Sequence, residues 1–354
     1  MIDVGAGTMD VLYYDSESGA HYKSVSRSSI IDLAEKINNI SGNLIITGNE
    51  MGGGNLSNIL RERIKRDKVI MTHAAASTIN HDHEKVRSMG VGIVTEEDAY
   101  EIAGDGSYTS LETSDLNMEK LRSIMKGIGV PFSFDVVGIC AQDHGVPPYG
   151  VSHLDFRHNI FKESLNQKPF PYSLLYRDDE VPPVMSRLTS IVKDAKKIPS
   201  KELYIMDSGM AAILGATLDL EALDRERIIV LDVATSHTVG AAMKGVEIAG
   251  FFEYHTSDIT LNRIETLIID LAEGKLNHAK ILEEGGHGAY IREKLGYDTI
   301  DLILATGPKR SIILGSTLPI KMGAPIGDNM MTGTAGLLEA IRLRKGLASF
   351  SRII

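Results

Sequence analysis

Short apolar runs alternate with amphipathic stretches over much of the chain. The runs at 43–47, 68–72 and 134–141 predict buried strands, because they are short and bounded by polar or turn-forming residues. Between them, apolar positions recur with the spacing of a helix face. The predicted helices cover 28–38, 56–66, 76–90 and 117–129. This alternation predicts the α/β fold class, with a sheet in which some strands are parallel.

Two segments far apart in the chain share one pattern. Residues 1–14 predict two strands around a glycine turn, and residues 228–256 predict three strands joined by turns. Both begin with an apolar strand, then Asp-Val, then a turn of small residues, so Asp3 corresponds to Asp232. A repeated unit of this kind predicts two related domains that face each other.

The remaining pattern adds helices and an irregular segment. Ser28 or Ser29 is the candidate N-cap of the first helix. The segment 145–185 holds several prolines with aromatic residues between them, which predicts irregular packing or a lid over a site. Further along we expect helices over 258–273 and 275–284, a buried strand over 301–307, and helices of small residues over 209–216 and 333–341.

Composition narrows the class of protein. The chain has 354 residues, which suits two domains, and a net charge of −10 without a dense basic run, so nucleic acid is not an expected partner. No stretch approaches the ~18 apolar residues of a membrane helix, and no signal peptide is evident. The single cysteine, Cys140, favours a reducing compartment. We therefore expect a cytoplasmic protein without a membrane partner.

The glycine turn near the N-terminus admits two interpretations. Gly5 and Gly7 are typical of a tight β-hairpin. They also leave backbone N–H groups free to surround a phosphate, and Thr8 adds a hydroxyl donor. Asp3, at the strand end, is placed to hold a hydrated Mg²⁺ ion. The residues alone leave both interpretations open.

Five motifs, in chain order, carry a resemblance to a known superfamily. "DVGAGTMD" resembles the first phosphate loop of the actin-like ATPases, which include actin, sugar kinases and the ATPase domain of heat-shock chaperones. "LDVATSHTVGA" is similar to the second phosphate loop, and "ILATGPKRSIILGS" to the adenosine-binding segment. "DSGMAAILGA" and "GTAGLLEAI" are similar to the two interdomain helices, which form the hinge in that superfamily.

The resemblance implies two ribonuclease-H-like domains around a nucleotide cleft. The first would cover 1–208 and 331–354, with insertions, and the second 209–330. ATP and Mg²⁺ would be the cofactors, with Asp3 and Asp232 at the metal. Phosphate binding would fall to Gly5, Ala6, Gly7, Thr8, Ser236, His237 and Thr238, and the adenosine to Gly307, Pro308 and Lys309, with Gly315 and Ser316 as further candidates.

A second resemblance is to an archaeal family labelled "putative pyruvate formate-lyase activating". It is carried by "DVGAGTMD", "MGGG", "AQDHG", "TGPKR" and "GAPIGDNMMTGTAGLL". Activases of that type hold an iron–sulfur cluster with three cysteines. Because this chain has one cysteine, we do not expect a radical iron–sulfur activase.

Polar residues follow the strand predicted at 134–141. Gln142, Asp143 and His144 lie at its carboxyl end, where open α/β sheets place ligand-binding groups. Asp143 or His144 is a candidate general base, and Gln142 is a candidate to orient a water molecule, since related strands carry a Gln or Glu there. The alternative is a strand-end turn with a capping aspartate.

Four further segments keep open alternatives. "MGGG" at 51–54 predicts either an anion site at a helix N-terminus, with Asn49 and Glu50 beside a substrate, or a flexible loop. The histidines near 81–84 are expected on a solvated helix face rather than at a metal. Residues 153–159 either line the cleft or contain an Asp155–Arg157 ion pair, and 283–290 either approaches the nucleotide or connects two helices.

Two functions fit this sequence. The first is Mg-dependent phosphoryl transfer or ATP hydrolysis with domain closure. The segment 145–185, interpreted as a lid over a substrate, favours a small molecule as the acceptor of the phosphoryl group. The second is a non-catalytic scaffold that has lost tight nucleotide binding. It is favoured by the absence of glycine from the turn 234–236, where any position that needs a positive φ would be strained.

Overall fold

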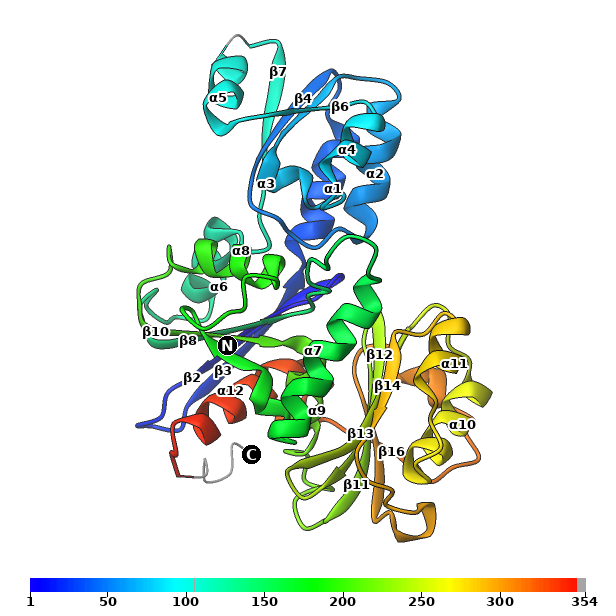
Figure 1. Cartoon of the computed structure of the whole chain (residues 1–354). Coiled ribbons are helices and arrows are strands. Elements are labelled where there is room, and N and C mark those ends of the chain that lie inside the picture. The colour runs from blue at the N-terminus through cyan, green and yellow to red at the C-terminus, as the bar shows by residue number, and fades with distance from the viewer. Residues whose placement is uncertain (105, 349–354) are drawn as a thin grey trace.

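The computed structural model describes residues 1–104 and 106–348, and in that part of the chain the strands form three sheets (Figure 1). The first sheet has the order β3-β2-β1-β8-β10-β9. Its strands are β1 (Ile2–Val4), β2 (Thr8–Tyr14), β3 (His21–Arg27), β8 (Phe134–Ala141), β9 (Leu175–Arg177) and β10 (Ser200–Asp207).

The second sheet has the order β14-β13-β12-β11-β15-β16. Its strands are β11 (Arg227–Val233), β12 (His237–Lys244), β13 (Glu247–His255), β14 (Gly288–Ile291), β15 (Leu302–Thr306) and β16 (Ile320–Met322). The two sheets repeat one arrangement. β1 and β11 are each antiparallel to the next strand of the chain and parallel to a later one, β8 or β15.

Apart from the edge strands β9 and β14, the two sheets share one order, β3-β2-β1-β8-β10 and β13-β12-β11-β15-β16. This order is that of ribonuclease-H-like domains, so the predicted fold class is confirmed. The predicted correspondence of Asp3 with Asp232 is confirmed as well, since both lie near the ends of the first strands. The domain boundaries at 208/209 and 330/331 stay a prediction, and residues 349–354 lie outside the described residues.

A third, all-parallel sheet is inserted between β3 and the helix α6 (Met118–Gly127). It has the order β6-β5-β4-β7 and forms the separate blue-to-cyan lobe in Figure 1. Its strands are β4 (Asn43–Gly48), β5 (Val69–Thr72), β6 (Val91–Val94) and β7 (Tyr108–Thr113). Its helices are α1 (Ser29–Asn39), α2 (Gly54–Ile64), α3 (His73–Ala76), α4 (His83–Ser88) and α5 (Glu96–Gly104).

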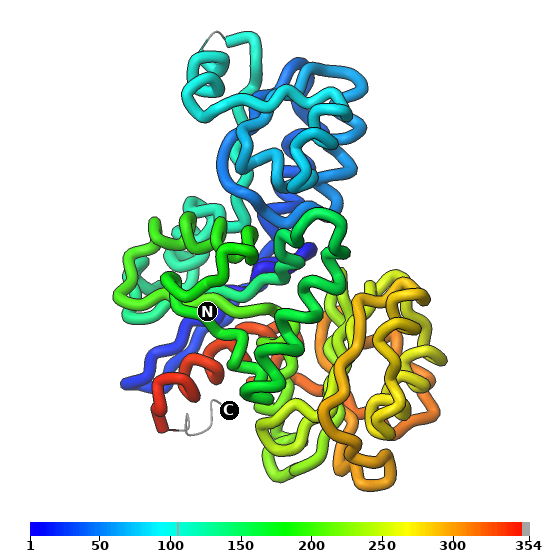
Figure 2. Tube along the Cα trace, in the orientation of Figure 1, coloured from blue at the N-terminus to red at the C-terminus, as the bar shows by residue number. Residues whose placement is uncertain are grey.

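Two helices of small residues link the first two sheets. α9 (Ser208–Ala216) follows β10 and α12 (Thr332–Arg344) follows β16, so each comes after the last strand of its sheet along the chain. A Cβ atom at Gly215 of α9 would lie 1.8 Å from the carbonyl oxygen of Thr332. Glycine therefore permits the two backbones to touch. Through α12, the red C-terminal segment returns beside the blue N-terminal strands (Figure 2).

Two predictions of secondary structure were wrong in part. The segment 145–185 is not irregular throughout, because it contains the helix α7 (His153–Gln167). The predicted helix over 76–90 is interrupted: residues after α3 form turns, and α4 begins only at His83, capped by Asp82. The carboxylate of Asp82 accepts hydrogen bonds from the backbone N–H groups of Glu84 and Lys85, which fixes this start.

The remaining helices agree with the pattern or were not predicted. They are α8 (Ser186–Ala195), α10 (Leu261–Ala272) and α11 (His278–Glu283), with short 3₁₀ turns at Pro171–Leu174, Tyr297–Thr299, Arg310–Ile313, Pro325–Gly327 and Asn329–Met331. The segment 283–290 joins α11 to the strand β14, so the expected helix–helix connection was wrong. Within the described residues, no helix combines the length and the apolar character needed to cross a membrane.

Candidate functional site

A cavity of about 530 Å³ lies where the first two sheets and the inserted lobe meet, and its volume suits a small-molecule ligand. Most residues expected at a site line it. They are Asp3, Gly5, Ala6, Thr8, Gln142, Asp143, His144, Asp232, Ser236, His237, Gly307 and Pro308. Gly7, Thr238 and Lys309 are outside the lining, and so are Gly315 and Ser316. The roles of all these residues stay predictions.

The first glycine turn is a β-hairpin. Gly5 donates its backbone N–H to the carbonyl of Thr8 at 3.0 Å, between the antiparallel strands β1 and β2. Neither glycine has a positive φ. Their lack of a side chain matters for space instead, since a Cβ at Gly7 would lie 3.1 Å from the side chain of Thr235. The hairpin thus contacts the second turn directly. Residues 5–8 can form a hairpin turn and still serve as a phosphate loop, so the two interpretations are compatible.

The second turn, residues 234–236, contains no glycine, and its backbone is not strained. Among the described residues other than glycine, only Ile326 has a positive φ, so Ala234, Thr235 and Ser236 adopt ordinary backbone conformations. Ala234 closes the turn by donating its N–H to the carbonyl of His237 at 3.0 Å. The expected obstacle to a phosphate loop at 234–236 is therefore not present.

Glycine is required at the turn after β15. Gly307 has φ +88°, and a Cβ there would lie 2.5 Å from the carbonyl oxygen of Val233. The backbone N–H of Lys309 donates to the same carbonyl at 2.9 Å, and the side-chain amide of Asn329 donates to the Gly307 carbonyl at 3.1 Å. The turn that the resemblance assigns to the adenosine is thus held against the second phosphate-loop candidate.

Among the described residues that line the cavity, four carboxyl groups have raised pKa values, and burial is the largest cause for each: Asp3, Asp10, Asp143 and Asp232. Partial burial raises the pKa of Asp3 to about 7, and the negative charges of Asp232 and Asp207 add to the rise. Burial raises the pKa of Asp232 to about 6. Burial and then the charge of Asp3 raise the pKa of Asp10 to about 8. A bound cation would relieve the repulsion among Asp3, Asp10 and Asp232, and carboxylate oxygens are ligands that Mg²⁺ accepts.

Asp10 was missed by the sequence analysis. It stands directly opposite Asp3 in the β1–β2 register, and its Oδ1 atom is buried with no hydrogen-bond partner in the described part of the chain. The predicted hairpin could have shown this, because residues equally far from the centre of the turn lie opposite each other, and Asp3 and Asp10 are such a pair. Gly333, at the start of α12, makes room for the pair, since a Cβ there would lie 2.0 Å from Oδ2 of Asp3.

The three residues after β8, Gln142, Asp143 and His144, have different surroundings. Both oxygens of Asp143 accept backbone hydrogen bonds, from Gly145 at 2.7 Å and from Leu188 at 3.0 Å, so this buried carboxylate fixes the loop. Gln142 donates its amide to Glu253 at 2.5 Å. Burial, with the positive charge of Arg157, holds the pKa of His144 well below the usual histidine value, so its ring is neutral at pH 7.

A buried ion network stands behind these residues. The guanidinium of Arg157 donates to Asp207 at 2.9 Å and to Glu253. Burial alone would raise the pKa of Glu253, but the adjacent Arg157 holds it well below its usual range. Asp155 instead contacts His278 at 3.3 Å, so the expected Asp155–Arg157 ion pair was wrong. No local pattern marked Glu253, whose strand reads as apolar.

The inserted lobe contributes to the same cavity. Gly52, Gly53 and Gly54 line it beside α2, although the N–H of Gly52 already donates to Asp115 at 3.2 Å. His81 and Glu50 also line it, with His81 Nε2 2.9 Å from Glu50 Oε1. The expectation that these histidines form a solvated helix face was wrong for His81, which precedes α4 and is only 24% exposed. Asn49, expected beside a substrate, instead binds Asp194.

The His81–Glu50 pair makes the stability of the folded protein depend on pH. The hydrogen bond to Glu50 raises the pKa of His81, so the folded state holds this proton more tightly than the unfolded state. The contribution is present below the ordinary histidine pKa of 6.5 and is lost as pH rises through the higher folded pKa. Wild-type protein should therefore lose about 1 kcal/mol more than Glu50→Gln between pH ~6 and pH ~8.5. Urea denaturation at both pH values measures this, and equal losses would contradict it.

The cavity is acidic overall. Among the described residues that line it, Arg187 is the single lysine or arginine, and its guanidinium already binds Asp115 at 2.8 and 2.9 Å. Anionic ligands such as phosphates would therefore need a divalent cation and backbone N–H groups for charge compensation. The site suits a metal-bound anion better than a free one.

Comparison with known proteins gives one matching family and several solved structures of low similarity. No curated protein matches. Solved structures that align include the ethanolamine utilization protein EutJ from Carboxydothermus hydrogenoformans, at 10% identity over 95% of this chain and 87% of that one, with a TM-score of 0.33. The ROK hexokinase from Thermus thermophilus aligns at 10% identity over 98% of both chains, with a TM-score of 0.29. At these values the likeness does not bear on activity.

The family model gives the firmer result. It is described as "Putative pyruvate format-lyase activating enzyme (DUF1786)" and matches residues 51–312, about three quarters of the chain. The matched part includes the inserted sheet from β5 onward, the loop after β8, and the second phosphate-loop candidate. Together with the strand order of the two repeated sheets, this match establishes that the chain is a member of that family, with an actin-like ATPase fold.

Proposed function

We propose that the cavity binds a Mg²⁺–ATP complex and that the protein transfers or hydrolyses its terminal phosphoryl group. One observation carries the proposal: Asp3 and Asp232 each precede the last residue of the first strand in two sheets that share a five-strand order, and both line one cavity. Two turns of matching position, 5–8 and 234–238, flank them and touch at Gly7 and Thr235. This pairing of acidic strand ends with small-residue turns suits a metal–phosphate ligand.

The residues present fit such a ligand. Asp3 and Asp232, with Asp10 beside them, would hold the hydrated metal ion, and the unpartnered Oδ1 of Asp10 is free to accept from a metal-bound water. Backbone N–H groups of the two turns other than those of Gly5 and Ala234, which close the turns, would contact phosphate oxygens. The Thr8 hydroxyl, which donates to Asp10 at 3.2 Å, would have to turn from it to join them. When bound, the metal ion would neutralise phosphate charge. Gly307 and Pro308 would lie along the adenosine.

A small-molecule acceptor is the proposed second ligand. The cavity extends to Glu50, His81 and the glycines of the inserted lobe, which are separate from the two turns in the chain. Carboxylate and imidazole groups at hydrogen-bond distance are suited to hold a hydroxyl group. The crossing of α9 and α12 at glycine backbones offers a place where the two units shear during closure.

Calorimetric titration tests the proposal. ATP added to the protein with Mg²⁺ should release or absorb heat with the stoichiometry of one site, and removal of the metal with a chelator should abolish the signal. Parallel titrations with other nucleotides identify the base that is preferred. An absence of heat with every nucleotide, for protein that melts cooperatively, would end the proposal.

A non-catalytic nucleotide-binding role is the second candidate. It is favoured by one observation, that Asp143 already accepts two backbone hydrogen bonds and is a poor candidate for a general base. Steady-state phosphate release decides between the two roles. Turnover that falls at least about tenfold in Gln142→Ala supports catalysis, whereas binding without turnover supports the second role.

The activity named in the family description is not part of this proposal. An iron–sulfur cluster is held by several cysteine thiolates. Cys140, the one cysteine of the sequence, is buried in β8, and burial raises its pKa well above the usual value. Its thiol is therefore neutral and packed in the sheet rather than available as a metal ligand.

A further inference from the structure

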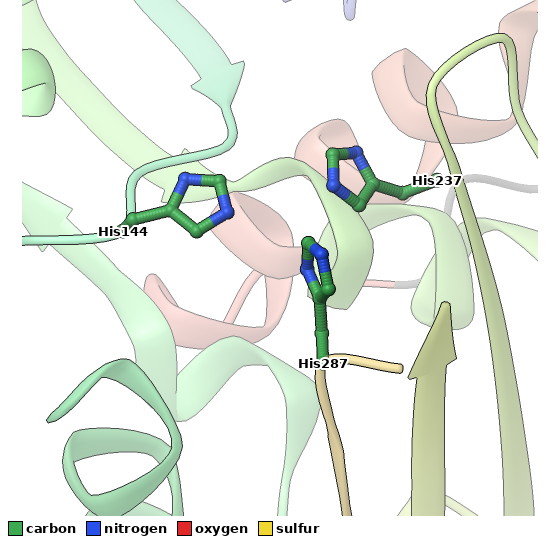
Figure 3. A group of neighbouring side chains, drawn as sticks. All are labelled: His144, His237 and His287. Carbon is green, nitrogen blue, oxygen red and sulfur yellow. The ribbon is translucent and has the colours of Figure 1, made fainter. Parts of the chain in front are cut away.

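Three histidines from separate segments converge beside the cavity: His144 and His237 line it, and His287 lies next to them. His144 follows β8, His237 begins β12, and His287 precedes β14. One nitrogen from each ring lies within 4.8 Å of the others, and the three rings face a common space (Figure 3). Two of the rings belong to the second repeated sheet and one to the first. The cluster therefore bridges the two halves of the molecule.

Two of these rings have a nitrogen without a hydrogen-bond partner among the residues that the structure describes. Nδ1 of His237 lies 2.7 Å from the hydroxyl of Ser236, which leaves Nε2 buried and unpaired. Nε2 of His287 lies 3.0 Å from Nε2 of His255, which leaves Nδ1 buried and unpaired. His287 is only 6% exposed. Buried polar atoms without partners are uncommon, and two in one cluster indicate a shared ligand.

The other contacts of these rings are those of metal-bound histidines. A ligating histidine normally fixes its second nitrogen with a hydrogen bond, as Ser236 does for His237 and His255 does for His287. Glu253 Oε1 lies 3.8 Å from Nδ1 of His287, too far for a hydrogen bond. Its carboxylate brings negative charge to the edge of the cluster.

We propose that His144, His237 and His287 bind one transition-metal ion, with zinc as the best-suited metal. Imidazole nitrogens favour zinc and its neighbours over magnesium. In a tetrahedral site, nitrogens at about 2.0–2.1 Å from the ion lie about 3.4 Å apart. The three ring nitrogens lie within 4.8 Å of one another, so the rings would approach one another as they close on the ion. Three histidines leave a fourth position open toward the cavity, as in catalytic zinc sites.

The charge state of two rings, those of His237 and His144, agrees with this assignment. Burial lowers the pKa of His237 to about 3, and burial with the charge of Arg157 lowers that of His144. Neutral imidazole is the form that binds a metal, and a neutral ring is a weak partner for phosphate. His144 was predicted as a general base from its place after a strand, and His237 was assigned to phosphate by the superfamily resemblance. Both would then hold a second metal beside the Mg²⁺–ATP site. This site does not depend on nucleotide binding.

Zinc titration without nucleotide tests the proposal. Protein purified without a polyhistidine tag and stripped with a chelator is titrated with Zn²⁺ against a coloured competing chelator. Co²⁺ in place of Zn²⁺ gives a visible spectrum that reports nitrogen ligands. Wild-type protein should bind one ion per chain, and His287→Ala and His237→Ala should each weaken binding at least about 100-fold. His287→Asn serves as a second variant should His287→Ala not fold.

Two controls separate this site from others. His21→Gln, a histidine change on β3 outside the cavity lining, should leave zinc affinity unchanged. Asp3→Asn should also retain zinc, which distinguishes the cluster from the carboxylate site and keeps the result separate from any failure to bind ATP. Sub-stoichiometric binding by wild-type protein, or equal affinity in folded His287→Asn and His237→Ala, would overturn the proposal.

Discussion

Asp3→Asn is expected to weaken the binding of ATP with Mg²⁺ at least about 100-fold, which corresponds to about 2.8 kcal/mol. The change removes a negative oxygen ligand from the proposed metal site and keeps the size of the side chain. Asp232→Asn should have an effect of the same size, because Asp232 holds the equivalent position at the end of β11. Isothermal titration calorimetry at fixed Mg²⁺ concentration measures both losses.

The fold should survive this substitution. Because the pKa of Asp3 is raised to about 7, the folded state binds more protons than the unfolded state between the ordinary pKa of 3.8 and about 7. The stability of the metal-free protein therefore falls as pH rises through this window, and Asn at position 3 removes that loss. At pH ~8 the variant should melt at or above the wild-type temperature.

A matched control places the same substitution on the surface. Asp135→Asn changes an aspartate that is 82% exposed and pairs with Lys201. It should leave the affinity for the nucleotide unchanged. Unchanged affinity in Asp3→Asn and Asp232→Asn as well would show that these carboxylates do not hold the metal.

Gly215→Ala is expected to destabilise the protein by about 3 kcal/mol or more. The new Cβ would lie 1.8 Å from the carbonyl oxygen of Thr332, a contact that real side chains do not make, so α9 and α12 would have to separate. Gly336→Ala should behave alike, because its Cβ would lie 1.8 Å from the carbonyl oxygen of Ala211. Urea denaturation followed by circular dichroism gives the change in stability.

Gly127→Ala is the matched control for the helix crossing. Gly127 ends α6, and a Cβ there would meet no atom within 4 Å. Alanine should therefore change stability by no more than about 0.5 kcal/mol. Equal stability of Gly215→Ala and Gly127→Ala would mean that the two interdomain helices do not pack backbone to backbone.

Local features of the fold were predictable because neighbouring residues determine them. The hairpin of residues 1–14 and the N-cap at Ser28 follow from the glycine turn and the serine hydroxyl, which accepts from the N–H of Ile31. The match between Asp3 and Asp232 was also readable, since each strand carries its aspartate at the same place before a turn. The inserted parallel sheet was predicted only through single strands, because pairing between distant strands leaves no local signal.

Prolines and histidines misled the sequence analysis where tertiary contacts decide. The prolines of 145–185 flank α7 rather than interrupt it, so the helix forms between them. Asp82 caps α4 and thereby leaves His81 outside the helix, free to meet Glu50. The convergence of His144 with His237 and His287 could not be predicted from the sequence, because three segments far apart in the chain bring them together.

A structure of the protein with Mg²⁺ and a non-hydrolysable ATP analogue tests the central claim most directly. We expect the phosphates between the turns at 5–8 and 234–238, the metal ion beside Asp3 and Asp232, and the adenosine along Gly307. A nucleotide bound elsewhere, or a cavity that excludes the analogue at saturating concentration while the protein remains folded, would contradict the account.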